Sequence, residues 1–394
     1  MKLAIAILSL RVLAAATEAV KIDVWKAGEE GYKVFRIPGI VVTAKGTLLA
    51  YAEARKSDRG DWNAIDIVLR RSTDRGRTWS PSRKIAEVEG PKHKNPVAIA
   101  QNLADNSDVT YNNPVAIPDR SGSVHFVFCL EYMRAFYMRS NDDGVTWSKP
   151  IEITSTFDRF RSDYDWKVLA TGPGHGIQLI NGRLLIPVWL STGTGGHAHR
   201  PSVTSIIYSD DRGRTWNRGA IAIPNTSEFI NPNETAAVQL ADGRVMLNAR
   251  NESKQNRRLV TISKDGATGW SKPKVVDALP EPICMAGFAR SGKLLLFSNP
   301  RNLDRRDGKA APGVPRDRRN LTLHVSHDEG QSWPVRKIIE PSWSGYSDIA
   351  IMRDGSVLLL YERGAAAEDR FRVEALTLAL LPPKSLAADK GATE

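Results

Sequence analysis

Cysteine is almost absent from the sequence, which has two, Cys129 and Cys284, among 394 residues. Two cysteines cannot build a disulfide framework or a cysteine-rich zinc site, so they are either two buried thiols or one bridge. Long apolar runs are also missing, because no stretch after the first twenty residues approaches the roughly 18 residues that span a bilayer. Aromatic residues at 7% and charged residues at 25% nevertheless exclude a disordered chain.

Acidic residues are in the minority, with 44 against 55 basic ones, a net charge of +11 and a pI near 9.6. The excess predicts an anionic partner, which could be nucleic acid, anionic lipid or an acidic small substrate. Convincing amphipathic helices are scarce. Short β-rich runs alternate with turn pairs such as Asn181-Gly182 and Asp354-Gly355.

The first twenty residues resemble a secretory signal peptide. Lys2 gives a positive start, residues 3–10 are apolar, and small residues follow at 14–16. Arg11 interrupts the apolar run, so a cytoplasmic N-terminal extension is the alternative. The sequence therefore predicts a secreted or periplasmic protein with a leader over 1–20, one domain over 21–382 and a polar tail over 383–394.

A repeated motif, S-x-D-x-G-x-[ST]-W, organises the middle of the chain. Four regular copies and a fifth with a displaced glycine begin at Ser72, Ser140, Ser209, Ser326 and Ser263. Asp side chains accept backbone N–H groups in turns, Gly allows positive φ, and Trp offers apolar surface. Because every copy has the same turn chemistry, we interpret the aspartates as scaffold and not as calcium ligands or catalytic acids.

One aromatic-bearing turn per about fifty to seventy residues, among many short strands, is typical of a β-propeller. We therefore predict an all-β fold, a six-bladed β-propeller with four-stranded antiparallel blades. The segment 21–25 is expected to pair with the C-terminal blade and close the ring, which removes exposed sheet edges.

Arg36 lies inside an otherwise apolar strand, in the run Val34-Phe-Arg-Ile-Pro38. This motif, followed by several copies of the S-x-D-x-G-x-[ST]-W box, resembles the sialidase (neuraminidase) family, above all its exo-acting bacterial and lysosomal-type members. The resemblance runs from Val34 to Glu362. It implies a six-bladed propeller with its active site at the centre and the boxes at the periphery.

The resemblance implies three arginines that bind the carboxylate of sialic acid. Arg36 matches the first and Arg250 the second. Arg318 is favoured for the third, with Arg319 as the register alternative. Arginine suits this task because its planar guanidinium donates two parallel hydrogen bonds to a carboxylate.

The general acid and base is matched by Asp61, with Asp58 of the same loop as the alternative. Arg55 matches a family arginine beside the bound sugar. Glu234 matches the base that activates a tyrosine nucleophile, Tyr346. A phenol suits this position because an anionic nucleophile would be repelled by the carboxylate on the anomeric carbon, and tyrosine, with a pKa of about 10, then needs a base.

Glu362 ends an apolar run and is expected to orient Arg36, since a buried carboxylate needs a partner. The loop Gly172-Pro-Gly-His-Gly176 is expected to shape the pocket, with His175 near the substrate. His197 and His199 are a weak indication of a metal site, because two histidines alone do not complete one. No metal or organic cofactor is required by the predicted chemistry.

The predicted function is that of a retaining exo-α-sialidase acting on sialylated glycoproteins, glycolipids and oligosaccharides, most simply as a monomer. The alternatives are a trans-sialidase that transfers the sugar to an acceptor or rearranges it internally, an enzyme for a related nonulosonic acid, and a non-catalytic glycan-binding propeller. Nucleic-acid binding would explain the charge but not an arginine placed within apolar strands.

Overall fold

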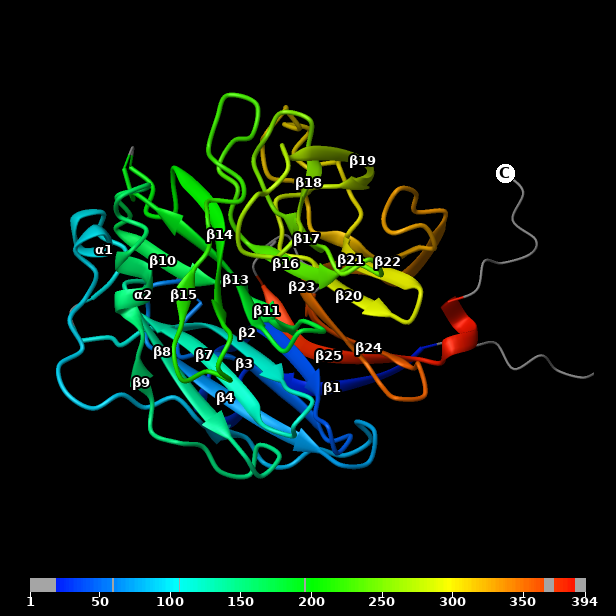
Figure 1. Cartoon of the computed structure of the whole chain (residues 1–394), viewed down its shortest axis with the longest axis horizontal. Coiled ribbons are helices and arrows are strands. Elements are labelled where there is room, and N and C mark those ends of the chain that lie inside the picture. Colours follow the sequence, from blue (N-terminus) through cyan, green and yellow to red (C-terminus); the bar gives the residue numbers. More distant parts are fainter. Residues whose placement is uncertain (1–18, 59, 106, 195, 365–371, 387–394) are drawn as a thin grey trace, which may run out of the picture.

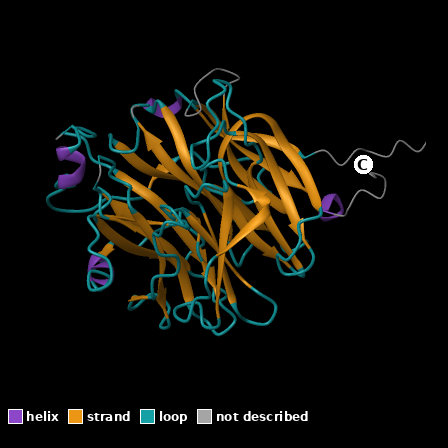
Figure 2. Cartoon of the chain, turned by 90° about the horizontal axis from the view of Figure 1, so that it is seen from above, coloured by secondary structure: helices purple, strands orange, loops and turns teal. Residues whose placement is uncertain are grey.

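The computed structural model describes residues 19–58, 60–105, 107–194, 196–364 and 372–386. The predicted leader, apart from residues 19 and 20, and most of the polar tail lie outside them. In the described part, strands dominate and the few helices are short pieces at the edges of the molecule (Figure 2). The helical elements are η1 (Glu29–Gly31), α1 (Pro96–Ala100), α2 (Thr154–Asp158) and η2 (Pro383–Leu386). None of the described helices is long and apolar enough to cross a membrane.

The strands form five sheets. One sheet is β2 (Val34–Val42), β3 (Leu48–Arg55), β4 (Ile65–Ser72) and β5 (Arg83–Lys84). The next is β11 (Gly174–His175), β6 (Tyr111–Pro118), β7 (Val124–Leu130), β8 (Arg134–Ser140) and β9 (Ile151–Glu152). The third is β10 (Val168–Thr171), β13 (Leu184–Ser191), β14 (Ser202–Ser209) and β15 (Asn217–Arg218), with β12 (Ile177–Gln178) also on β13.

The fourth sheet is β16 (Thr235–Gln239), β17 (Val245–Ala249), β18 (Arg257–Ser263) and β19 (Lys274–Pro280). The largest, in spatial order, is β1 (Val20–Lys26), β25 (Val373–Leu381), β24 (Val357–Gly364), β23 (Val335–Ile351), β22 (Arg319–Ser326), β21 (Leu294–Pro300) and β20 (Gly287–Ser291). It has seven strands because the first half of β23 pairs with β22 and the second half with β24. Counting the two halves separately leaves six groups of strands, which is compatible with the predicted ring.

The groups are arranged around a centre to which each contributes an innermost strand (Figure 1). In ring order these are β2, β6, β10 with β12, β16, β20 and the second half of β23, which contacts β2 again. The fold is a β-propeller. As predicted, the N-terminal strand closes the ring, because β1 pairs antiparallel with β25.

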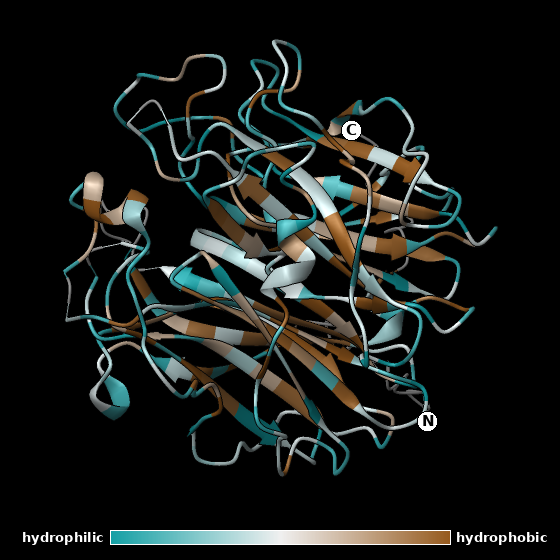
Figure 3. Cartoon of the chain, turned by 60° about the vertical axis from the view of Figure 1, so that its left-hand side comes forward, coloured by the Kyte–Doolittle hydropathy of each residue, from teal (hydrophilic) through white to brown (hydrophobic). Residues whose placement is uncertain are grey.

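The apolar residues of the strands pack between neighbouring sheets, and Figure 3 shows hydrophobic colour along the strands and hydrophilic colour in many loops. One cluster joins Ala50 of β3 to Leu360 of β24, and another joins Val127 of β7 to Ile186 of β13. Cys129 and Cys284 are both buried and unpaired, so of the two alternatives the structure has two thiols and no bridge. Burial raises the pKa of each thiol to about 12.

The repeated boxes form the turns that lead to the outermost strand of their groups. In the box at Ser72, the hydroxyl donates to Asp74 at 2.8 Å and accepts the N–H of Gly76 at 2.8 Å, while Asp74 accepts two hydrogen bonds from Thr78. The degenerate copy at Ser263 uses the same bonds to Asp265. These aspartates therefore serve the turns, as predicted, and lie away from the centre of the ring.

Candidate active site

A polar cavity of about 190 Å³ lies where the innermost strands begin. Arg36 and Ile37 come from the start of β2 and Asn113 from the start of β6. Glu234 directly precedes β16, and Tyr346 marks the middle of β23. Six of the eight predicted site residues line this cavity, namely Arg36, Asp61, Glu234, Arg250, Arg318 and Tyr346.

Tyr346 is the centre of the arrangement. Its hydroxyl donates to Oε1 of Glu234 at 2.5 Å and accepts an N–H of Arg250 at 2.7 Å. Arg250 also donates to the second oxygen of Glu234, so the phenol, the carboxylate and the guanidinium form a closed triangle. A phenol whose proton already points at a carboxylate is arranged to lose it when the oxygen forms a bond.

Two further guanidinium groups approach the same ring. The Cζ atoms of Arg36 and Arg318 each lie 5.3 Å from the ring centroid of Tyr346. Arg318 is 6% exposed and donates to the carbonyl of Ile283, whereas Arg319 is partly exposed and lies beside Asp304. The structure therefore brings Arg318, and not Arg319, to the cavity together with Arg36 and Arg250.

Glu362, on β24, holds the start of β2 in place. It is 1% exposed and accepts two hydrogen bonds from Arg36, at 3.0 and 3.3 Å. It also accepts the backbone N–H groups of Ile37 and Tyr346. One buried carboxylate thus fixes both the first arginine and the backbone that carries the tyrosine.

Asp61 stands at the mouth of the cavity with its side chain 39% exposed, while Asp58 of the same loop is exposed to solvent. Arg55 donates to Asp61 at 2.9 Å, and Arg36 lies 4.0 Å from the same oxygen. Arg55 is itself 2% exposed and is paired with the buried Glu53. Arg55 therefore supports Asp61 and is not among the residues that line the cavity.

The charges set the protonation states of the site. Burial of Asp61 by itself favours the neutral acid, yet Arg55 and Arg36 hold the pKa of its carboxyl well below the usual range. Burial raises the pKa of Tyr346 well above its usual value, although the surrounding arginines oppose the shift. In the empty site the phenol is therefore neutral and Asp61 is ionised.

The backbone around the cavity is irregular. The antiparallel ladders shift register between Arg36 and Gly39 and between Ser344 and Ser347. Ile37 and Ile283 line the cavity with φ of 56° and 64°, a conformation that costs a β-branched residue on the order of 1–3 kcal/mol. Such strain occurs at functional sites, where the surrounding structure holds the backbone in place.

One part of the wall was not predicted from the sequence. His199 packs against the rings of Trp62, Tyr132 and Trp189, and all but Trp62 line the cavity. Burial lowers the pKa of His199 to about 4, so its ring is neutral. The His-Ala-His pattern was the only sequence signal for this wall. The described residues hold no group of three or more acidic, His or Cys side chains suited to a metal ion.

His175 was expected near the substrate, and this is wrong. It lies on β11, which pairs with β6, and lines a different cavity, where its Nδ1 faces Asp348 at 2.7 Å. The cause is the parallel pairing of β11 with β6, which sets His175 opposite Ala116, near the end of β6, whereas the candidate active site lies at its start.

Comparison with known proteins identifies the family. The model of the BNR repeat-like domain matches residues 46–359. A sialidase of Micromonospora viridifaciens is 31% identical over 355 residues, and a sialidase of Bacteroides fragilis is 31% identical over 371 residues. The matches cover 86% and 88% of this chain, which spans 51% and 63% of the length of these relatives.

Among solved structures, the Hadza microbial sialidase Hz136 is similar with a TM-score of 0.72 and 26% identity, over 93% of this chain and 69% of that one. Together with the repeated boxes and the arginine-lined centre of the ring, these likenesses show that the chain belongs to the sialidase family of BNR-repeat β-propellers.

Proposed function

We propose that this protein is a retaining exo-α-sialidase, which hydrolyses terminal sialic acids through a tyrosine nucleophile. The observation that carries the proposal is the hydrogen bond from the hydroxyl of Tyr346 to Glu234, made at the meeting point of three arginines. The substrates we expect are sialylated glycoproteins, glycolipids and oligosaccharides, which an exported enzyme would meet outside the cell.

The first step is capture of the substrate carboxylate. Arg36, Arg250 and Arg318 converge from three elements on one place beside the phenol. Arg36 is held by Glu362 and Arg318 by a backbone carbonyl, so the guanidinium groups are oriented before binding. Preorganised donors of this kind bind an anion without losing much side-chain entropy, and they orient the anomeric carbon toward the tyrosine.

The second step is protonation of the leaving glycosidic oxygen by Asp61. In the free protein Arg55 and Arg36 keep this carboxyl ionised, which is the wrong state for an acid. A bound carboxylate would neutralise Arg36 and exclude water from the mouth of the cavity. Both changes favour the protonated form, so substrate binding itself prepares the acid.

The third step is attack on the anomeric carbon. The carboxylate attached to that carbon would repel an anionic nucleophile, whereas the phenol of Tyr346 is neutral until Glu234 takes its proton. Tyr346 then forms a glycosyl-tyrosine bond as the glycosidic bond breaks. Asp61, now ionised, removes a proton from water, and that water releases the sugar with its original anomeric configuration.

The test compares two tyrosines that each donate to a glutamate. Tyr346→Phe removes the proposed nucleophile, and the control Tyr361→Phe removes a hydroxyl that donates to Glu340 at 3.1 Å. Both variants and the wild type are assayed on a fluorogenic α-sialoside, and the products are followed by NMR. We expect the Tyr346 variant to lose at least about a thousandfold in kcat while the control keeps near wild-type activity.

Retention predicts that the first sugar released is the α-anomer. An initially formed β-anomer would contradict the double displacement. If the folded wild type turns over none of the nonulosonic acid glycosides tested, the proposed enzyme activity is wrong. Adding lactose as an acceptor separates hydrolysis from transfer. If sialyllactose is the main product, the protein is a trans-sialidase and the proposal of hydrolysis is wrong.

A further inference from the structure

The innermost strands carry a second and larger cavity where they end. It has a volume of about 650 Å³, within the usual range of small-molecule sites, and we refer to it as the distal cavity. β2, which begins with Arg36 in the candidate active site, ends with residues 40–42 on the distal cavity. β23 does the same between Tyr346 and residues 349–351. The two cavities therefore lie at opposite ends of the same strands.

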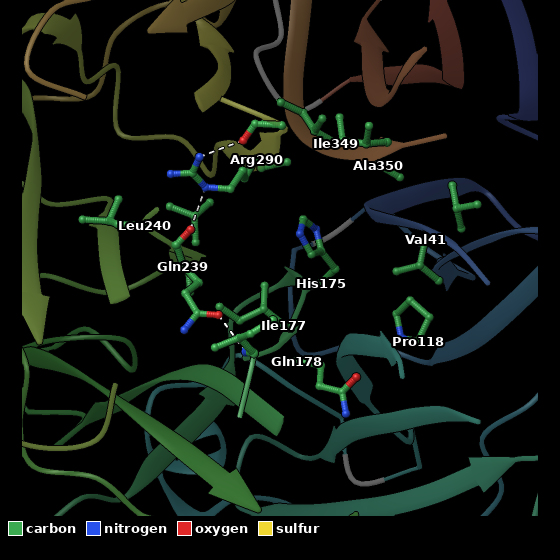
Figure 4. A pocket seen from close by; sticks show the side chains of 18 of the residues that line it. Val41, Pro118, His175, Ile177, Gln178, Gln239, Leu240, Arg290, Ile349 and Ala350 are labelled. Atoms are coloured by element: carbon green, nitrogen blue, oxygen red, sulfur yellow. Dashed lines mark hydrogen bonds between the residues drawn. The ribbon is translucent and has the colours of Figure 1, made fainter. Parts of the chain in front are cut away.

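Aliphatic side chains make most of the distal wall, and Figure 4 shows them around the opening with His175 between them. Val41, Ile177, Leu240 and Ile349 come from four different strands or strand ends. Of the described residues that line the cavity, none has a phenyl, phenol or indole ring. Such a wall suits an aliphatic body, because an aromatic ligand would have no ring to stack on.

His175 is the polar group that this wall surrounds. Its Nδ1 faces Oδ1 of Asp348 at 2.7 Å, and Asp348 is 1% exposed and also accepts the N–H of Ile40 at 2.9 Å. In the part of the chain that the structure describes, Nε2 of His175 has no protein hydrogen-bond partner. Burial disfavours the imidazolium, but the charge and the hydrogen bond of Asp348 outweigh burial and raise the pKa of His175. When the ring is protonated, a state that Asp348 favours, Nδ1–H points to Asp348 and Nε2 has an N–H to donate within an apolar surround.

The other charges of the lining also favour an anion. The rim has two cationic side chains, Arg290 and Lys293, and one carboxylate, Glu329, which is paired with Arg290. Arg290 donates in addition to the carbonyl of Gln239 at 2.8 Å, so it is held at the rim (Figure 4). Lys293 is exposed and adds a positive charge at the entrance.

We propose that the distal cavity binds a small aliphatic carboxylic acid, with its hydrocarbon body on the Val, Ile and Leu wall and its acid group on Nε2 of His175. The imidazolium then bridges two carboxylates, that of Asp348 and that of the ligand. A charge-assisted hydrogen bond in an apolar surround is stronger than one between neutral groups, and this gives acids an advantage over alcohols of equal length. The site is separate from the proposed sialidase chemistry and does not depend on it.

Octanoate and octan-1-ol are the probes, because they share a chain and differ in the acid group. Their binding to the whole protein is measured by calorimetry and by saturation-transfer NMR. We expect octanoate to bind at least about tenfold more tightly than octanol, and His175→Gln to remove that advantage while octanol binding stays unchanged. Thermal unfolding shows whether each variant is folded.

A second variant, Ile351→Asp, keeps the test valid if His175→Gln does not fold. Ile351 is partly exposed on the cavity wall, so a carboxylate there is tolerated and should repel octanoate more than octanol. Arg250→Ala is the control for octanoate binding in the candidate active site, whose arginines also attract carboxylates. Loss of octanoate binding in Arg250→Ala, or equal binding of acid and alcohol by the wild type, would overturn the proposal.

Discussion

The two ends of the innermost strands differ in chemistry and in backbone regularity. The end with Tyr346 gathers three arginines and the carboxylates of Asp61 and Glu234. The end with His175 is mostly aliphatic, with the His175–Asp348 pair inside the wall and Arg290, Lys293 and Glu329 at the rim. The same strands supply side chains to both cavities. The average hydropathy or strand propensity of a strand therefore does not tell which side chains it gives to each cavity.

The difference lies in how each end turns side chains toward the axis. At the distal end the ladders are regular, because β2 pairs without a shift from Gly39 to Val42 and β23 from Ser347 to Ile351. At the other end the ladders of β2, β6 and β23 all shift register, after Arg36, Asn112 and Ser344. Bulges of this kind redirect single side chains and are frequent beside active sites. The charged end is therefore built by departures from strand geometry.

Between the two ends, the largest difference is expected from two carboxylates that each hold an arginine. Glu362 is buried and pairs with Arg36, while Glu329 is partly exposed and pairs with Arg290. Glu362→Gln should lower the free energy of unfolding by about 3 kcal/mol and kcat/KM about a hundredfold, because it weakens a buried pair and releases Arg36. Glu329→Gln should change the free energy of unfolding by less than about 1 kcal/mol and leave kcat/KM unchanged.

Urea unfolding and the fluorogenic assay measure both variants. Equal losses of stability and activity in Glu362→Gln and Glu329→Gln would show that the two ends depend equally on their ion pairs.

A smaller effect is expected from added methyl groups. A Cβ at position 345 would lie 2.1 Å from an oxygen of Glu362, so Gly345→Ala should displace that carboxylate and reduce kcat/KM at least about tenfold. At the distal rim, a Cβ at position 292 meets no atom within 4 Å, but φ is 58°. Gly292→Ala should therefore cost about 1 kcal/mol of stability through strain and leave kcat/KM intact.

The same unfolding and kinetic measurements apply. Normal kinetics in Gly345→Ala would mean that Glu362 does not need its present position.

Protonation provides a third comparison. Arg55 and Arg36 hold the pKa of Asp61 low in the free protein, so neutralising Arg36 with a bound carboxylate should raise that pKa. Binding of an unsaturated sialic acid near pH 5 should then take up a fraction of one proton, seen by calorimetry in buffers of different ionisation enthalpy. Asp61→Asn should abolish the uptake, and His175→Gln should not. If the binding heat is the same in all buffers, ligand binding does not protonate Asp61.

The smallest effect is expected at the periphery, away from both ends. Hydrogen bonds from Thr146 lower the pKa of Asp142 to about 2, so the ionised side chain stabilises the fold above its ordinary pKa near 4. That contribution is lost as the pH falls through 2. Asp142→Asn should lower the melting temperature by a few degrees at pH 7 and very little at pH 2, with unchanged kcat/KM.

A pH-independent loss in Asp142→Asn would show that the carboxylate charge does not stabilise the turn.

The sequence was most informative where a residue type is unusual for its surroundings. Arg36 in an apolar strand and Glu362 at the end of another are costly unless they pair, and they pair with each other. The repeated box predicted the turns and, through their spacing, the propeller. The pairing of β1 with β25 could also be predicted, because an open ring would leave two exposed edges.

Other features arise only when distant segments meet. His199 and Trp189 have no periodic pattern, and their meeting with Tyr132 depends on loops whose path the sequence does not encode locally. The distal wall consists of ordinary core residues, such as Val41 and Ile349, and becomes a cavity only through closure of the ring. His175 was misplaced because the parallel pairing of β11 with β6 has no sequence signal.

The closing pair of strands has a consequence for synthesis. Thr377 of β25 donates to Asp23 of β1 at 2.7 Å, and the two residues are 354 positions apart. When β1 leaves the ribosome, its partner has not yet been translated, so β1 waits with an open edge for nearly the whole length of the chain. Such non-local pairing slows folding and exposes the strand to other chains in the meantime. Translation of β25 therefore ends the period in which the edge of β1 is open to other chains.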